Sequence, residues 1–237
     1  MDATSPEVAI PVLHAVTNDE IVRAPNFLER ARVVMRAMRD RGALHLRAPK
    51  MMEEQGAAIV ELALSLAEEQ ERTGAWLVIN DRIDIALIVC ARGVQLTGRS
   101  LAVADAAQVL LRACERNTTA AAPTAIGASV HSLEEAIESR LTGASWGVAR
   151  DVIGQAQMPT SQSNARQTSD GPELLRQLVR FSGIPIIAIG GVLPMHVGDL
   201  RRAGAHGVAA IRGVWDVEHS ERAVIDYLSA YDSEVGR

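Results

Sequence analysis

The sequence has few aromatic residues and only two cysteines. Phe, Trp and Tyr make up 3% of the 237 residues, whereas hydrophobic residues together make up 48%. A core of this composition must be built from Val, Ile, Leu and Ala, as buried parallel strands and their covering helices usually are. Cys90 and Cys114 form no CxxC or metal-spaced cluster, so we expect two buried free thiols in helices rather than a disulfide framework or a zinc site.

Long apolar runs and an excess of one charge are also missing. No apolar stretch approaches the roughly 20 residues of a membrane span, and residues 1–8 lack the positive and apolar regions of a secretory signal. The formal net charge is −5, with acidic and basic residues interleaved. This balance argues against nucleic acid or a membrane surface as a partner, and we expect a cytoplasmic protein.

The sequence does contain a regular alternation of short apolar strands and amphipathic helices. We expect strands at 13–16, 43–49, 76–81, 93–96, 125–130, 145–152, 185–191 and 207–211. We expect helices at 27–41, 52–73, 83–90, 101–116, after Ser132, and at 172–181, 194–204 and 218–231. Strict alternation implies a parallel sheet, and eight units imply a single (β/α)8 barrel over residues 1–237. The alternative, a doubly wound open sheet, would need fewer units or a second domain.

In a barrel of this kind, the residues that follow the strands share one face, and that face carries the active site. Here the ring consists of Thr17, Arg47, Asn80, Asp81, Gln95, Ser129, His131, Asp151, Gly190, Gly191 and Arg212. Polar strand ends occur in every barrel, so each residue alone is weak evidence of function.

His131 is the first candidate, because it lies where an apolar strand meets a helix. Ser132 and Glu135 have the S-x-x-E spacing of a capping box, which starts the helix directly after His131. An imidazole at such a junction can move protons near neutral pH. The alternative is a histidine that only hydrogen-bonds a neighbouring loop.

The glycines after the last two strands indicate a phosphate site. Gly190 and Gly191 follow one strand, and Arg212 and Gly213 follow the next. In barrels this position binds phosphate through backbone N–H groups, and glycine lets the backbone approach closely. Arg212 would add charge, although a surface salt bridge is the alternative for this side chain.

Two further strand ends carry charged side chains. His45 and Arg47 share one face of their strand, so Arg47 would point into the barrel mouth and bind a carboxylate or phosphate; the alternative is a structural ion pair inside the barrel. Asp81 could bind Mg²⁺ or cap the next helix. Without a second carboxylate nearby, we expect the cap.

At this point the motifs resemble a known family, the thiamine phosphate synthase/TenI superfamily. The matching segments are H-L-R at 45–47, V-I-N-D-R-I-D-I-A at 78–86, G-V-Q-L at 93–96, I-G-A-S-V-H-S-L-E-E-A at 126–136, I-P-I-I-A-I-G-G at 184–191 and A-G-A-H-G-V-A at 203–209. Of these, S-V-H-S-L-E-E-A beside H-L-R and N-D-R-x-D-I-A is the most specific. The resemblance implies a (β/α)8 barrel that handles phosphorylated thiamine precursors.

The superfamily has two main branches. Its synthases join a pyrimidine pyrophosphate to a thiazole phosphate and need Mg²⁺, whereas the TenI tautomerase aromatises a thiazole phosphate carboxylate by moving a proton without metal. The synthase pattern expects a Lys at position 49, an acid at position 100 and a Lys in the loop after the sixth strand. Here the first two are Pro49 and Ser100, and residues 153–171 contain no Lys. A pyrophosphate leaving group needs metal and cationic charge, so these departures favour the tautomerase branch.

By this resemblance, His131 is the general acid/base, and the substrate-binding residues are Arg47, Asn80, Ser129, Gly190, Gly191, Arg212 and Gly213. The resemblance implies no cofactor and no metal, with a phosphorylated thiazole as substrate, and it leaves a homo-oligomer open. The alternatives are a divergent thiamine phosphate synthase and a non-catalytic phosphate-binding regulatory barrel. The strand exit at 149–154 departs from the family pattern, and the polar loop 154–171 is either a functional lid or disordered.

Overall fold

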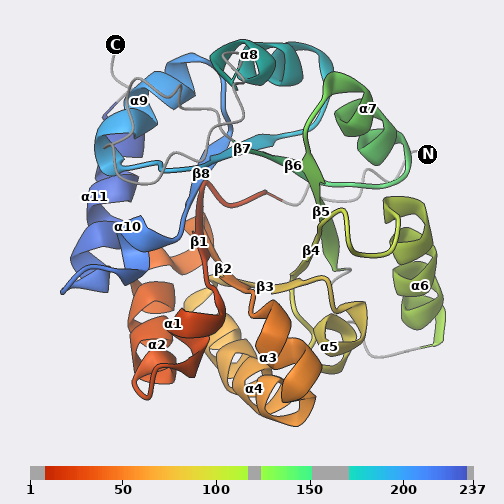
Figure 1. Cartoon of the computed structure of the whole chain (residues 1–237), viewed down its shortest axis with the longest axis vertical. Coiled ribbons are helices and arrows are strands. Elements are labelled where there is room, and N and C mark those ends of the chain that lie inside the picture. The colour runs from red at the N-terminus through yellow and green to blue at the C-terminus, as the bar shows by residue number, and fades with distance from the viewer. Residues whose placement is uncertain (1–8, 117–123, 151–170, 234–237) are drawn as a thin grey trace, which may run out of the picture.

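Eight parallel strands form a closed barrel, which confirms the expected architecture (Figure 1). The computed structural model describes residues 9–116, 124–150 and 171–233. The strands are β1 (Leu13–Val16), β2 (Gly42–Leu46), β3 (Trp76–Asn80), β4 (Gly93–Leu96), β5 (Ala125–Val130), β6 (Trp146–Ala149), β7 (Ile186–Ile189) and β8 (Gly207–Ala210). Each strand pairs with the next, and β8 closes the ring against β1.

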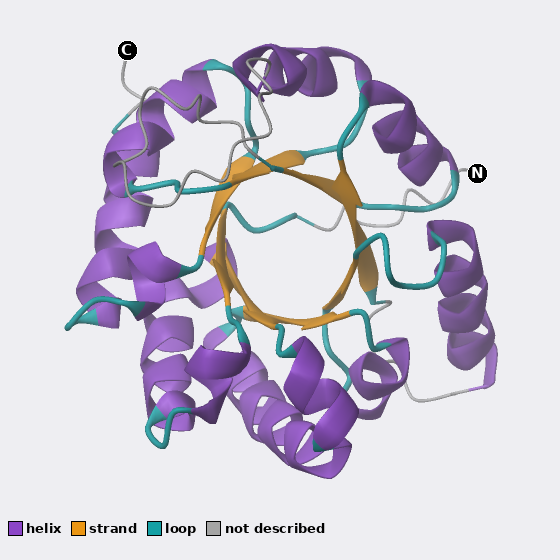
Figure 2. Ribbon diagram, viewed as in Figure 1, coloured by secondary structure: helices purple, strands orange, loops and turns teal. Residues whose placement is uncertain are grey.

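Helices surround the ring of strands on its outside (Figure 2). They are α1 (Asp19–Arg23), α2 (Phe27–Met38), α3 (Pro49–Glu54), α4 (Gly56–Thr73), α5 (Ile83–Ile88), α6 (Val103–Arg116), α7 (Leu133–Leu141), α8 (Gly171–Phe181), α9 (Pro194–Arg202), α10 (Arg212–Trp215) and α11 (Ser220–Asp232), with a 3-10 turn η1 (Arg39–Arg41). Among the described residues, no helix is long and apolar enough to cross a membrane.

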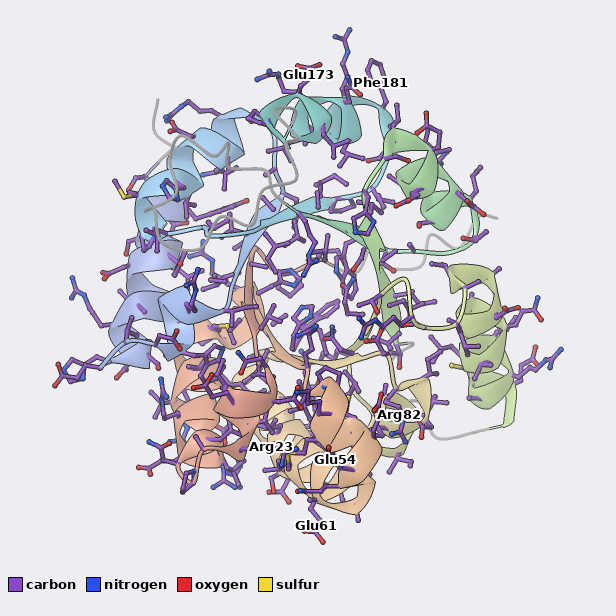
Figure 3. All side chains as sticks on the ribbon, in the orientation of Figure 1. Arg23, Glu54, Glu61, Arg82, Glu173 and Phe181 are labelled. Carbon is purple, nitrogen blue, oxygen red and sulfur yellow. The ribbon has the colours of Figure 1, made fainter. Side chains whose placement is uncertain are left out.

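Strand alternation divides the apolar residues into two cores. Outward-facing residues such as Leu44 and Leu46 pack against the helices in the larger core, while inward-facing residues such as Trp76 and Val78 form a smaller core inside the barrel. Figure 3 shows side chains filling this interior. Burying one such side chain contributes roughly 1.5–3 kcal/mol to stability. The packed interior forms a floor beneath the barrel mouth, which is the rim at the carboxyl ends of the strands.

Trp146 is the largest fully buried side chain, and two glycines make room for it. It is 0% exposed, and a Cβ atom on Gly127 would lie 2.2 Å from its indole ring. A Cβ atom on Gly93 would lie 2.9 Å from the Val78 side chain and 3.1 Å from the indole. The Gly residues in β4 and β5 are therefore explained by close packing, against the indole at Gly127 and against Val78 and the indole at Gly93, rather than by a turn.

Several local expectations were wrong. The predicted helix 52–73 is two helices, α3 and α4, separated at Gln55, and Pro49 is the first residue of α3 rather than the end of a strand. The short helices α1 and α10 were not predicted.

Both cysteines, expected to be buried, are exposed. Cys90 follows the end of α5, and Cys114 is on α6. Asp151 and all of the polar loop except Gly171 lie outside the described residues.

Candidate active site at the barrel mouth

Arg47 lies at the carboxyl end of β2 and is held there through its backbone. The Thr17 hydroxyl accepts a hydrogen bond from the Arg47 backbone N–H at 2.9 Å and lies 3.0 Å from the Arg47 carbonyl oxygen. His45 is buried and Leu46 packs in the outer core, so these two residues alternate as expected, and Arg47 directly follows the last residue of β2. Among the described residues, the Arg47 guanidinium has no hydrogen bond or ion pair, so the alternative of a structural ion pair does not hold.

His131 follows β5 at the same rim, and its side chain is 57% exposed. Its Nδ1 lies 3.1 Å from a carboxylate oxygen of Glu135, and the same oxygen accepts the His131 backbone N–H at 2.8 Å. Ser132 caps α7 as predicted, by accepting the Glu135 backbone N–H. The capping-box spacing indicates only a capping role for Glu135, and the i,i+4 spacing from His131 was the signal for this contact.

The expected helix cap at Asp81 is wrong. The residue at the start of α5 is Arg82, without a side-chain cap, and Asp81 turns toward the segment that follows β4. Its Oδ1 accepts the Thr97 backbone N–H at 2.9 Å, the Thr97 hydroxyl at 2.9 Å and the Ser100 hydroxyl. The positive φ of 61° at Asp81 directs the chain this way. Local sequence could not show this, because the donors lie beyond the next strand.

The residues of this corner do not fit the Mg²⁺ site that the synthase branch implies. One Asp81 oxygen is already occupied by three donors, and Ser100 supplies a hydroxyl where a second carboxylate would be needed. Mg²⁺ prefers carboxylates in an octahedral arrangement. Across residues 9–116, 124–150 and 171–233, no group of three or more His, Cys, Asp or Glu side chains could hold a metal ion.

A chain of buried polar groups lies beneath the mouth. His14 Nε2 is 2.9 Å from the Pro11 carbonyl oxygen, and His14 Nδ1 is 2.7 Å from His45 Nε2. Burial lowers the pKa of His14 to about 4, and burial together with the neighbouring His14 keeps the pKa of His45 well below its usual value. Both rings are therefore neutral at pH 7.

The Pro11 carbonyl fixes the protons along this chain. It needs a donor, so His14 carries its proton on Nε2, and His14 Nδ1 must accept the Nε2–H of His45. The side chain of Asn80 lies beside His45, and its hydrogen bond raises the pKa of that ring against the larger, opposite effect of burial. Asn80 is 3% exposed, and its Oδ1 has no partner among the described residues. An unpaired acceptor is thus left at the carboxyl end of β3.

Two other predicted rim residues, Gln95 and Ser129, differ in whether their side chains are available to bind a ligand. The Gln95 side chain accepts the indole N–H of Trp146 at 3.0 Å and donates to the Leu96 carbonyl at 3.2 Å, so both ends of its amide are used within the barrel. Ser129 is half-buried, pairs in register with Val148 and lies on the inner face of β5, two residues before His131. Ser129 therefore remains a candidate, whereas Gln95 has a structural role.

The loops after β7 and β8 have the backbone geometry of an anion site. Gly190 and Gly191 have φ angles of 120° and 65°, a region that favours glycine. The N–H groups of Gly190, Gly191 and Val192 have no acceptor among the described residues. Arg212 and Gly213 begin α10, where no helical carbonyl can accept their N–H groups.

Arg212 is exposed. Its side chain has no salt bridge within the described ranges, so the alternative of a surface ion pair does not hold there. The phosphate site therefore stays a proposal. Among the described residues, unpaired backbone N–H groups and the Arg212 guanidinium are available there to bind an anion.

Arg150 was missed as a candidate. It follows β6, is exposed, and makes no ion pair or hydrogen bond among the described residues. The register places Val130 beside Ala149 and Ala149 beside Ala188, so Arg150 lies between His131 and the loop after β7. Its position directly after an apolar strand was the signal.

The fold and the polar rim define the class of this protein: a (β/α)8 barrel with its candidate site at the carboxyl ends of the strands. Residues 13–214 match a protein family described as "Thiamine monophosphate synthase". The chain belongs to this family and is an enzyme of thiamine biosynthesis, with phosphorylated thiamine precursors as the implied substrates. The resemblance to the superfamily is thereby confirmed.

The named relatives carry the synthase activity in their names. A thiamine-phosphate synthase of Pyrococcus horikoshii is 32% identical over 163 residues, which cover 69% of this chain and 70% of the relative. One from Methanoculleus marisnigri is 27% identical over 230 residues, covering 94% and 97%. The solved thiamine phosphate pyrophosphorylase of Pyrococcus furiosus superposes with a TM-score of 0.74 at 24% identity, covering 95% and 97%. The names of the two sequence relatives favour the synthase branch over the tautomerase branch, and the solved structure shows the shared fold.

Proposed function

We propose that this enzyme is a thiazole phosphate tautomerase, which aromatises a thiazole phosphate carboxylate without a metal ion. The observation that carries the proposal is the corner around Asp81. Thr97 and Ser100 donate three hydrogen bonds to one oxygen of this carboxylate, and among the described residues Asp81 belongs to no group of three or more His, Cys, Asp or Glu side chains that could hold a metal ion. A proton shift needs neither the metal nor the concentrated positive charge that a pyrophosphate leaving group requires.

His131 is the proposed proton carrier. The Glu135 carboxylate accepts from Nδ1 at 3.1 Å, and this hydrogen bond keeps the proton of the neutral ring on Nδ1. Nε2 is then the bare nitrogen that can remove a proton from the substrate and return it to another carbon. A base oriented by a neighbouring acceptor is the usual arrangement for such a group.

The remaining rim residues are proposed to hold the substrate. Its phosphate would bind the free N–H groups of the loops at Gly190, Gly191 and Gly213, with Arg212 adding charge. Its carboxylate would pair with the unpaired guanidinium of Arg47. Asn80 and Ser129 would contact the ring from the inner face. These two anions at opposite ends would orient the ring carbons toward His131.

A second candidate function is thiamine-phosphate synthase. The names of the relatives favour it, including one 32% identical to this chain. It would require Mg²⁺ to bind at Asp81 in place of the hydrogen bonds from Thr97 and Ser100. The third candidate, a regulatory barrel that binds phosphate without turnover, predicts binding but no reaction.

The test is conversion of the non-aromatic thiazole phosphate carboxylate, followed by the absorbance of the aromatic product. We expect the same rate in EDTA and in excess Mg²⁺. A parallel assay mixes the pyrimidine pyrophosphate with the aromatic thiazole phosphate and Mg²⁺ and measures thiamine phosphate. Coupling in the second assay without conversion in the first would overturn the proposal in favour of the synthase. Calorimetric binding with neither reaction would favour the regulatory barrel.

A further inference from the structure

Tyr227 of α11 contacts two glycine-containing loops, the one after β7 and the one after β8. Its ring is buried, and its hydroxyl donates to the Val192 carbonyl oxygen at 2.6 Å. Val192 belongs to the loop after β7, directly after Gly191. The next backbone N–H, that of Leu193, donates to His196 Nδ1 at 3.1 Å. The peptide between Val192 and Leu193 is therefore fixed at its carbonyl by Tyr227 and at its N–H by His196.

The same hydroxyl also packs against the loop after β8. A Cβ atom on Gly213 would lie 2.1 Å from the Tyr227 oxygen and 3.2 Å from the ring carbon that carries it. Only a glycine fits there while the hydroxyl holds Val192, because the buried ring cannot move aside. The register pairs Ile189 with Ala209, so the two loops leave neighbouring strands.

We propose that Tyr227 is a positioning residue that holds the loops Gly190–Val192 and Arg212–Gly213 together as one phosphate-binding cradle. The inference rests on the proposed function, since it assumes that these loops bind the substrate phosphate. Tyr227 does not touch the ligand; it fixes the carbonyl of Val192, and so the adjoining N–H groups keep the spacing that a phosphate needs. Such preorganisation increases affinity because the loops need not be ordered on binding.

Tyr231, one turn further along α11, offers a matched control. Its hydroxyl also donates to a backbone carbonyl, that of His206, at 3.0 Å. His206 precedes β8 and so lies at the amino end of the barrel, away from the mouth. Tyr227→Phe and Tyr231→Phe therefore remove the same chemical group from the same helix, at opposite ends of the barrel.

The experiment is calorimetric titration of the full-length wild-type protein and both variants with inorganic phosphate, and with the phosphorylated thiazole and its unphosphorylated alcohol. We expect Tyr227→Phe to weaken binding of both phosphate compounds about tenfold, the effect of losing one hydrogen bond, and to leave the alcohol unchanged. Tyr231→Phe should bind all three like the wild type. In turnover, Tyr227→Phe should raise KM with little change in kcat.

The outcomes separate the two proposals. If the wild type binds no phosphate compound, both the proposed phosphate site and the role of Tyr227 are overturned. If the wild type binds phosphate and Tyr227→Phe binds it equally well, the phosphate site stands and the role of Tyr227 is overturned. A second variant tests the contact with Gly213: Gly213→Ala should weaken phosphate binding strongly in the wild type and less in Tyr227→Phe, because the clashing oxygen is gone. Equal losses in the two backgrounds would contradict the inference.

Discussion

The two histidines in the barrel interior and the histidine on its rim have the same side chain in different environments. His14 and His45 are enclosed, hydrogen-bonded to each other and kept neutral by burial. His131 is 57% exposed and paired with an exposed carboxylate. The interior pair is fixed in one tautomer and cannot exchange protons with a ligand, whereas the rim histidine has a free nitrogen in reach of solvent. Burial here serves stability and positioning, and exposure leaves room for chemistry.

The contrast extends to the neighbours of each group. In the interior every partner fits closely, as Trp146 does against Gly127, so a change there should act on folding. On the rim, Arg47 and Arg150 have no ion-pair partner among the described residues, so changes there should act on ligands. The four predictions below test this division, from the largest expected effect to the smallest.

Trp146→Ala should produce the largest effect, a loss of about 3–5 kcal/mol in the free energy of unfolding. The substitution leaves a cavity in the barrel floor and removes the donor from the Gln95 amide. Urea unfolding measures it. Phe181→Ala is the control, because Phe181 is 54% exposed at the end of α8 (Figure 3) and should change stability by no more than about 0.5 kcal/mol. Similar losses for the two variants would contradict the division.

Acidification should destabilise the protein through the interior pair. The pKa of folded His14 is lowered to about 4, whereas an unfolded histidine titrates near 6.5. Between these values the unfolded state binds more protons, so stability is full above about pH 6.5 and falls as the pH drops toward 4, by roughly 3 kcal/mol for His14.

Urea midpoints measured from pH 7.5 to 4.5 check this slope. The variant His14→Gln should flatten the profile. A profile in His14→Gln as steep as in the wild type would show that other groups cause the acid sensitivity.

His131→Asn should lower turnover of the thiazole phosphate carboxylate by about 10²-fold or more, equivalent to about 2.7 kcal/mol in the barrier. Ligand affinity and the unfolding midpoint should change little, because the side chain is exposed. Steady-state kinetics and calorimetry measure the two effects. Unchanged turnover in this variant would exclude His131 as the catalyst and, with ligand still bound, favour the regulatory barrel.

Glu135→Ala should have the smallest effect. An exposed contact of this kind contributes at most about 1 kcal/mol to stability, and loss of the orienting hydrogen bond should reduce turnover only about three- to fivefold, since the imidazole remains. The exposed Glu138→Ala on the same helix is the control and should match the wild type in turnover. A loss as large as that of His131→Asn would mean that Glu135 takes part in proton transfer itself.

Much of the fold could be read from local pattern. Eight apolar runs alternating with amphipathic segments were enough to predict the closed barrel, because each strand buries both faces and each helix buries one. Breaks within segments were less predictable. The division of the predicted helix 52–73 at Gln55 and the short helix α10 depend on how the chain packs at the mouth rather than on propensity.

The sequence by itself determined the barrel, the order of its strands and rim residues such as Arg47, Asn80 and His131, since strand periodicity assigns each side chain to a face. Only the tertiary structure decided what those residues meet. In the folded chain Asp81 accepts hydrogen bonds from Thr97 and Ser100 instead of capping a helix, and His14 contacts His45. Tyr227 packs against two loops that are more than ten residues away in the chain. Such partners come from different strands and helices, and closing the barrel is what brings them together.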